Sequence, residues 1–292
     1  MLIDEGNLAG ARDTFEVSLA IHERLAKVDP SNAQWQRDLS IAHYKIGDVL
    51  VAEGNFRAAL DACKALHDIL ERLARSDPGN AQWQRDLFVS LWRMADIERK
   101  QGNPASALES IRNGKTIIER LASKDQNNAG WQRDLTAIHE FIGDVLVDQG
   151  ELPAALGAYE TALAIRGRLS QADPTNADWQ CDLSVAHEKV GDVLAAQGNA
   201  PAALKAYTAE FTIMERLAKA EPGNARWQRD LAISYQKIGI VSAQMNSKTE
   251  ALAALRQGLE IMQQLAKLSP ENAVWRRDVE IFKSRIATLE QM

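Results

Sequence analysis

Residues 32–38 read NAQWQRD, and almost the same seven residues return at 80–86, 128–134, 176–182, 224–230 and 272–278. Six of the seven tryptophans lie in these stretches, each 48 residues from the next. A fixed period of this size without insertions is the signature of a stacked repeat array. Each unit of such an array buries its apolar face against its neighbours. The repeat therefore predicts one continuous array over residues 1–292.

Each repeat reads as two antiparallel helices, which we name helix A and helix B. Asn32 follows the turn at residues 29–31 and is a good N-cap, and apolar residues then recur every three or four positions from Trp35. Gly54 stops this helix A after about 20 residues, and helix B runs on to Asp77. The predicted boundaries are a half repeat at 1–31, repeats at 32–79, 80–127, 128–175, 176–223 and 224–271, and a terminal capping helix at 272–292.

Three apolar columns hardly vary from repeat to repeat. Small Ala lets two helices approach closely, and large Ile and Leu fill the space between layers. The columns are Ile21, Ile69, Ile117, Ile165, Ile213 and Ile261; Leu25, Leu73, Leu121, Leu169, Leu217 and Leu265; and Ala11, Ala59, Ala107, Ala155, Ala203 and Ala251.

The composition narrows the class of protein. No run of about 18 apolar residues is present, so we expect no membrane span, and the opening MLIDEGNLAG lacks the features of a signal peptide. Cys63 and Cys181 occupy different repeat positions, which gives neither a disulfide framework nor zinc spacing. We expect a cytoplasmic protein without metal or cofactor. The net charge of −6 argues against nucleic acid as the main partner.

The repeat resembles the tetratricopeptide repeat. That family shows a Leu-Gly pair, a large residue three later, an Ala after the turn and an aromatic residue four further on. Here the pattern reads Ile46-Gly47, Leu50, Ala59, Cys63; then Ile142-Gly143, Leu146, Ala155, Tyr159; then Val190-Gly191, Leu194, Ala203, Tyr207. The family period is about 34, so each helix is longer here, and repeats of the kinesin light chain type look more similar.

The resemblance implies an all-α, right-handed superhelical solenoid of about eleven or twelve helices. It also implies a concave groove, lined by the A helices, that binds a protein or peptide without catalysis. We find no Ser-His-Asp set, phosphate-binding loop or metal motif in the sequence. One alternative is a regulatory or sensor segment of a larger signalling protein that carries an effector domain. Another is a self-assembling scaffold, in which the last helix A docks head to tail on the first helix B of a second molecule.

Two aromatic columns are best explained by packing. His43, His139 and His187 share a column, but neighbouring repeats lie about 10 Å apart, too far for two ring nitrogens to share one zinc ion. The tryptophan column lies in the first turn of helix A, where it can pack on the Leu73 column of the preceding repeat. We therefore expect both columns to be structural.

Charged columns are more informative about partners. Arg37, Arg85, Arg133, Arg229 and Arg277 form one, which we expect to pair with Glu23, Glu71, Glu119 and Glu215 near the end of the preceding helix B. Asp48, Asp96, Asp144 and Asp192 form another. By the resemblance this second column faces the groove, which suggests a partner with basic groups. The alternative is neutralisation by Lys45, Arg93 and Lys189, three residues earlier on the same helix face.

Repeat two departs from the others. Trp92, Arg93, Arg99 and Lys100 form an aromatic and basic cluster, and Trp and Arg are typical of binding hot spots. The alternative is sequence drift in one repeat. The candidate groove residues are Tyr44, Asp48, Trp92, Arg93, Asp96, Arg99, Lys100, Glu140, Asp144, Asp148, Glu188, Asp192 and Gln236.

Overall fold

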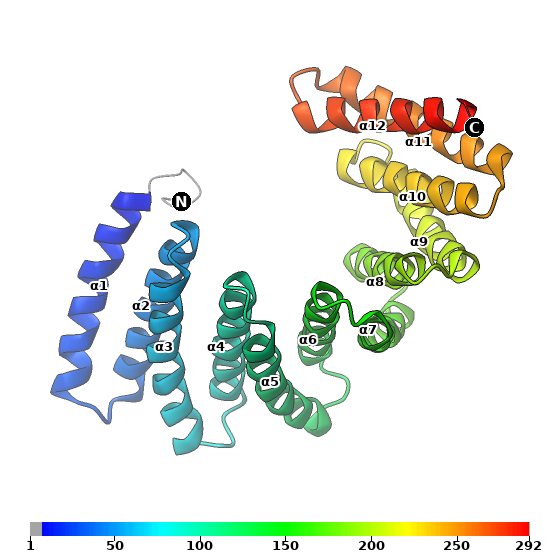
Figure 1. Cartoon of the computed structure of the whole chain (residues 1–292). Coiled ribbons are helices and arrows are strands. Elements are labelled where there is room, and N and C mark those ends of the chain that lie inside the picture. Colours follow the sequence, from blue (N-terminus) through cyan, green and yellow to red (C-terminus); the bar gives the residue numbers. More distant parts are fainter. Residues whose placement is uncertain (1–7, 292) are drawn as a thin grey trace. The chain divides into compact units, whose positions relative to one another are not determined.

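The computed structural model describes residues 8–291, and in this range the chain forms twelve α-helices and no strand (Figure 1). The all-α fold built from repeated helix pairs is confirmed. Residues 1–7, which open the predicted half repeat, and residue 292 lie outside the described range. The helices are α1 (Leu8–Val28), α2 (Ala33–Ala52), α3 (Phe56–Ser76), α4 (Ala81–Lys100), α5 (Pro104–Lys124), α6 (Ala129–Asp148), α7 (Leu152–Ala172), α8 (Ala177–Ala196), α9 (Ala200–Ala220), α10 (Ala225–Gln244), α11 (Lys248–Leu268) and α12 (Ala273–Gln291).

The helices group into two compact units, divided between Gln149 and Gly150. Unit 1 holds α1 to α6 and unit 2 holds α7 to α12. Even-numbered helices are the A helices and odd-numbered helices are the B helices. The predicted single array and its repeat boundaries remain predictions. Among the helices of residues 8–291, none is both long and apolar enough to cross a membrane.

Each helix A begins at its asparagine for a local reason. The side chain of Asn32 accepts a hydrogen bond from the backbone N–H of Trp35 at 3.1 Å, and the equivalent bond forms in all six stretches. This bond satisfies one of the backbone donors that the first helical turn leaves without a partner. After α2, Gly54 turns the chain with a φ of 75°, a conformation that favours glycine. In the last repeat Asn246 takes that position with a φ of 59°.

The alanine column brings the helices together. All six of its members have 0% exposed surface. Opposite it, glycines on the A helices leave room for large side chains of helix B. A Cβ atom on Gly191 would lie 2.5 Å from the ring of Tyr207, and one on Gly239 would lie 2.8 Å from Leu255. Small residues on both helices therefore set the close approach that the sequence predicted.

The Ile and Leu columns are buried or half-buried on B helices that pack between two A helices. Ile69 is 5% exposed and Leu121 is 2% exposed. Ile21, by contrast, is 51% exposed, because α1 packs mainly on α2. The tryptophans pack as expected on the Leu column of the preceding helix B: Trp83 with Leu73, Trp131 with Leu121, Trp227 with Leu217 and Trp275 with Leu265.

Candidate functional site

All thirteen candidate residues lie on A helices, half-buried or exposed. Unit 1 carries ten of them on α2, α4 and α6, and unit 2 carries three on α8 and α10. They lie as follows: Tyr44 and Asp48 on α2; Trp92, Arg93, Asp96, Arg99 and Lys100 on α4; Glu140, Asp144 and Asp148 on α6; Glu188 and Asp192 on α8; Gln236 on α10.

An apolar column that the sequence reasoning missed runs beside these residues. Its members are partly exposed, and Ile41, Val185 and Val89 reach 44%, 38% and 36%. We call this column the apolar ladder; it consists of Ile41, Val89 and Ala137 in unit 1 and Val185, Ile233 and Ile281 in unit 2. Its signal was an apolar residue six positions after every repeat tryptophan. The candidate site was predicted from columns that vary between repeats, and the ladder hardly varies.

One row of ion pairs lies along the ladder, one helical turn before it. The guanidinium of Arg37 contacts Asp86 at 3.2 Å, and Arg85–Asp134 and Arg229–Asp278 repeat this contact at 2.8 Å. Each arginine thus reaches the next helix A, 49 residues further on. The predicted pairing with glutamates of the preceding helix B is wrong for Arg37, Arg85 and Arg229.

The glutamates have nearer partners. Glu71 pairs with Arg75 and Glu215 pairs with Lys219, each on its own helix four residues away. The arginines instead project sideways to the neighbouring helix A, where an aspartate is already fixed in the first turns. The row therefore ties successive A helices together.

One position in the row has lost its arginine. Cys181 stands there, and the aspartate 49 residues further on is Asp230. Burial raises the pKa of Asp230, against the opposing effect of Arg226 and Arg229. Burial also raises the pKa of the Cys181 thiol, which favours its neutral form. A thiol has no cationic form, so Cys181 does not replace the charge of an arginine.

A second row of ion pairs involves the acidic column. Asp48 pairs with Arg93, and Asp192 pairs with Lys237 at 2.6 Å. In both cases the cation lies 45 residues after the acid, on the next helix A. The alternative of neutralisation by a base three residues earlier on the same helix is therefore wrong for these two acids. Asp96 is paired on its own helix, with Lys100 four residues later at 2.7 Å.

The aromatic and basic cluster of repeat two turns inward. Trp92 packs against the core of unit 1, with ring centroids 6.1 Å from Phe88 and 5.3 Å from Phe141. Arg93 lies 4.0 Å above the ring of Tyr44. Trp92 is thus part of the packing between α4 and α6, and Arg93 joins α4 to α2.

The other bases of this cluster also have acidic partners within unit 1. Arg99 contacts Asp148 at 2.7 Å and lies 3.7 Å from Asp144. Glu98, on the same helix, occupies a slot that holds Leu50 in the first repeat. Ser110 donates a hydrogen bond to the carboxylate of Glu98 at 2.8 Å, and burial raises the pKa of Glu98.

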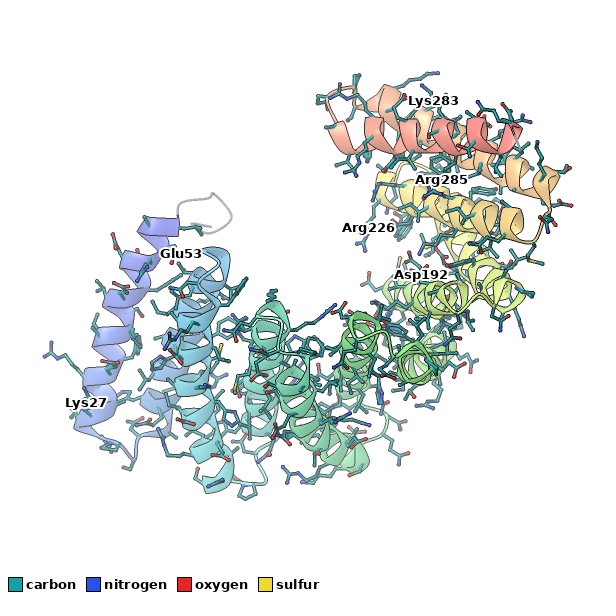
Figure 2. All side chains as sticks on the ribbon, viewed as in Figure 1. Lys27, Glu53, Asp192, Arg226, Lys283 and Arg285 are labelled. Atoms are coloured by element: carbon teal, nitrogen blue, oxygen red, sulfur yellow. The ribbon has the colours of Figure 1, made fainter. Side chains whose placement is uncertain are left out.

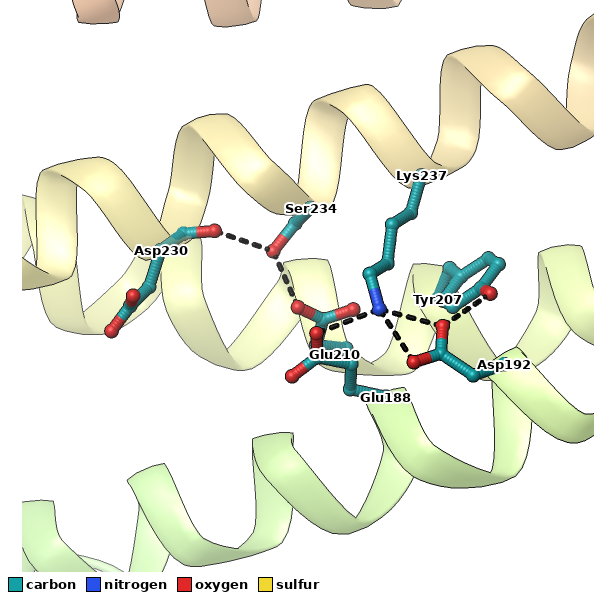
Figure 3. A network of polar contacts seen from close by, with 7 residues as sticks. All are labelled: Glu188, Asp192, Tyr207, Glu210, Asp230, Ser234 and Lys237. Carbon is teal, nitrogen blue, oxygen red and sulfur yellow. Dashed lines mark hydrogen bonds and ion pairs between the residues drawn. The ribbon is translucent and has the colours of Figure 1, made fainter. Parts of the chain in front are cut away.

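Unit 2 contains a denser polar network between α8, α9 and α10. The ammonium of Lys237 lies between the carboxylates of Glu188, at 2.7 Å, and Asp192, at 2.6 Å (Figure 3). Tyr207 donates its hydroxyl to Asp192 at 2.7 Å. Burial works against the charge of Lys237, but the two carboxylates outweigh it and raise the pKa of the ammonium.

Glu210 lies at the buried side of this network. Its residue is 4% exposed, and one carboxyl oxygen accepts a hydrogen bond from Ser234 at 2.8 Å. The other oxygen is buried without a hydrogen-bond partner in the described structure. Burial, with a contribution from Glu188, raises the pKa of Glu210 to about 8. The sequence held a signal for this group, since the same column reads Ser18, Leu66, Gly114, Ala162 and Gly258 elsewhere.

The histidine column behaves as packing. Burial lowers the pKa of His43, His139 and His187, so their neutral rings are favoured between the helices.

Residues 3–67 match the tetratricopeptide repeat family. The likeness of the chain to solved structures extends this match to a shared fold, that of repeated helix pairs of the tetratricopeptide type. Among solved structures, this repeat protein is similar to BtubC (BKLC) from P. vanneervenii, with a TM-score of 0.67 and 16% identity over 88% of this chain and 92% of that one. It is also similar to a Podosopora anserina putative kinesin light chain with nearly identical TPR-like repeats, with a TM-score of 0.57 and 12% identity over 78% and 95% of the two chains.

A third similar structure is aspartyl phosphate phosphatase F from Bacillus subtilis. Its TM-score is 0.62 at 11% identity, over 89% of this repeat protein and 59% of that chain. No curated protein matches the sequence. At these identities the likenesses show a shared fold, and the expected similarity to kinesin light chain repeats is confirmed at that level.

Proposed function

We propose that this protein is a non-catalytic scaffold that binds a segment of a partner protein along the apolar ladder of each unit. The observation that carries the proposal is the ladder itself, a partly exposed apolar column repeated on every helix A. Contiguous exposed apolar surface with a polar rim is typical of interaction sites. Tetratricopeptide-type folds commonly mediate contacts between proteins, which supports the same function.

The ion pairs beside the ladder support this function in another way. They hold neighbouring A helices at a fixed spacing, so the ladder is a prearranged surface. The bases of the two rows already have acidic partners within the chain, so the rows do not require a ligand of particular charge. These bases are Arg37, Arg85, Arg93 and Lys237. A partner with basic groups remains a prediction, but its support is weaker, since Asp48 and Asp192 are neutralised from within the chain.

A peptide display experiment tests the proposal. Peptides selected on the intact protein would be measured against a ladder variant, Ile41→Glu with Val185→Glu, and against a control variant on outer faces of B helices, Thr116→Glu with Thr212→Glu. We expect more than tenfold weaker binding to the ladder variant, because a carboxylate would be desolvated against the bound apolar side chains. Circular dichroism would show that both variants stay folded. Equal affinity of selected peptides for all three proteins, or no selected peptide, contradicts the proposal.

Self-association is a second candidate, favoured by the exposed face of α1. Ile21 and Val17 are 51% and 62% exposed there. The outer side of α12 fits this poorly, because Lys283 (Figure 2) and Glu290 are exposed where α2 has His43 and Leu50. Light scattering over a concentration series tests it. A mass that stays at 32.3 kDa would reject it, and growth that Ile21→Asp abolishes would support it.

The proposal also covers the location of the protein in the cell and its role within a larger protein. A cytoplasmic location is supported by the free thiols of Cys63 and Cys181. A role as the sensing segment of a larger signalling protein is compatible with the same binding face. Detection of an effector domain on the same polypeptide in the source cells, by mass spectrometry of the intact protein, would decide the second point.

A further inference from the structure

The apolar ladder is hollowed at one place in unit 1. Between Ile41 of α2 and Val89 of α4 lies an open pocket of about 340 Å³. Its floor is formed by Leu66 and Leu70 of α3, each 3% exposed. This volume is at the lower end of the range for small-molecule sites. The pocket therefore suits one large apolar side chain.

The polar rim of the pocket is uneven in charge. At one end Arg37 is neutralised by Asp86. At the other end stands Lys45, which is exposed and makes no ion pair with any residue that the structure describes. The ammonium of Lys45 lies 5.7 Å from the centroid of the Tyr44 ring. Among the described residues, the pocket thus carries one cation without an ion-pair partner.

The rest of the row shows what such a cation binds. Arg93 and Lys237 occupy the same repeat position as Lys45, and each is paired with an aspartate on the neighbouring helix A. The geometry of this position therefore favours a carboxylate. At Lys45 that carboxylate is not supplied by residues 8–291, so it can come from a ligand.

A second hollow lies on the other side of α2. It has a volume of about 160 Å³, lies between α1 and α2, and shares Ile41 and Lys45 with the first pocket. Phe15 and His22 of α1 line its far side. The two hollows are separated by one helix, about 10 Å. In an extended polyproline II chain, which rises about 3.1 Å per residue with three residues per turn, side chains three residues apart lie about 9 Å apart on the same side of the chain.

We infer that this part of the ladder binds an extended acidic peptide segment in which two apolar side chains are three residues apart and flank a carboxylate. The larger apolar side chain fills the pocket between Ile41 and Val89. The carboxylate binds Lys45 as it crosses α2, and the smaller apolar side chain enters the second hollow. This inference rests on the proposed function and names a partner class for one part of the ladder.

Fluorescence anisotropy with synthetic peptides tests the inference. The probes are pools of dye-labelled eight-residue peptides with Phe, Leu, Ile or Trp at one position, Leu or Val three positions later, and Asp or Glu between them. Matched pools carry Lys in place of the acid, or Ser in place of the first apolar residue. We expect the acidic pool to bind, and both matched pools to bind at least about fivefold more weakly.

Protein variants locate the contact. Lys45→Met keeps most of the side-chain length and removes the charge, and should weaken binding of the acidic pool about three- to fivefold while abolishing its preference over the Lys pool. Val89→Glu should weaken binding more than tenfold. Lys205→Met, the same change on the exposed face of α9, should have no effect.

Two outcomes overturn the inference. One is equal binding of acidic and Lys pools, and the other is no binding of the acidic pool up to millimolar concentration. Failure here is distinguishable from failure of the proposed function. If peptides from the display experiment still lose affinity on ladder substitution, the ladder binds partners and only the acidic motif is wrong.

Discussion

The buried carboxyl of Glu210 gives a prediction about stability and pH. Its pKa is about 8 in the folded protein, against an ordinary value of 4.5. The folded state therefore keeps this proton to higher pH than the unfolded state does. Below pH 4.5 both states are protonated and the group has no effect. As pH rises from 4.5 to 8, the unfolded state gains a favourable ionisation that the folded state resists, and stability falls.

The size of the fall follows from the two pKa values. At about 1.36 kcal/mol for each unit of pKa difference, Glu210 should lower the free energy of unfolding by about 3 kcal/mol between pH 5 and pH 7.5. The groups around it enter the same balance: Glu188 and Asp192 disfavour its ionisation, and Lys237 favours it. Glu210→Gln keeps an acceptor for Ser234 and removes the titration. The variant should therefore lose much less stability than the parent over this range.

Urea denaturation followed by circular dichroism, at half-unit pH steps, measures the effect. Glu215→Gln on the same helix is the control, because Glu215 forms a surface pair with Lys219, and it should follow the parent. Since repeat arrays need not unfold in two states, the carboxyl carbon of Glu210 would also be titrated by nuclear magnetic resonance. A parent-to-variant difference that stays constant within 0.5 kcal/mol, with a carboxyl midpoint near an ordinary value, about 4, would refute the reasoning.

Four further predictions concern packing, and denaturation midpoints measure each of them. Leu121→Ala should cost about 2–4 kcal/mol because the side chain is 2% exposed, whereas Ile21→Ala should cost less than about 1 kcal/mol; similar costs would contradict the burial pattern. Trp92→Ala should lower the free energy of unfolding by about 3 kcal/mol. An unchanged midpoint would show that Trp92 lies at the surface and not in the core. Gly258→Ala would place a Cβ atom 2.5 Å from a phenyl ring and should destabilise by about 1–3 kcal/mol. A Cβ atom on Gly157 would have nothing within 4 Å, so Gly157→Ala should stabilise by about 0.5–1 kcal/mol; a gain of stability in Gly258→Ala would contradict the first glycine prediction, and a loss in Gly157→Ala would contradict the second.

The helices could be predicted because their signals are local. Asn32 caps the helix that begins beside it, and Gly54 ends the same helix. The alanine column could be predicted too, since a small residue at a fixed position in every repeat has few explanations other than close packing. Each of these inferences needs only the order of residues within one repeat.

The ion pairs of the candidate site could not be predicted in the same way. Whether Asp48 pairs along its own helix or across to Arg93 depends on the rotation of one helix A relative to the next. The sequence of a single repeat does not contain that angle. Trp92 illustrates a second limit, because it is held in place by Phe141, a single aromatic residue in a column that is otherwise basic.

The contact of each arginine with an aspartate 49 residues later also bears on how the molecule can change length. Apart from the repeat at 176–223, where Cys181 replaces the arginine, each full repeat carries an arginine for one neighbour and an aspartate for the other. If residues 80–127 were removed in frame, Arg37 would meet Asp134, the aspartate that Arg85 holds now. Duplication or deletion of whole multiples of 48 residues would therefore bring an arginine and an aspartate together at the new junction between repeats. The number of ladder residues, and so the length of partner that can be covered, is open to change by recombination alone.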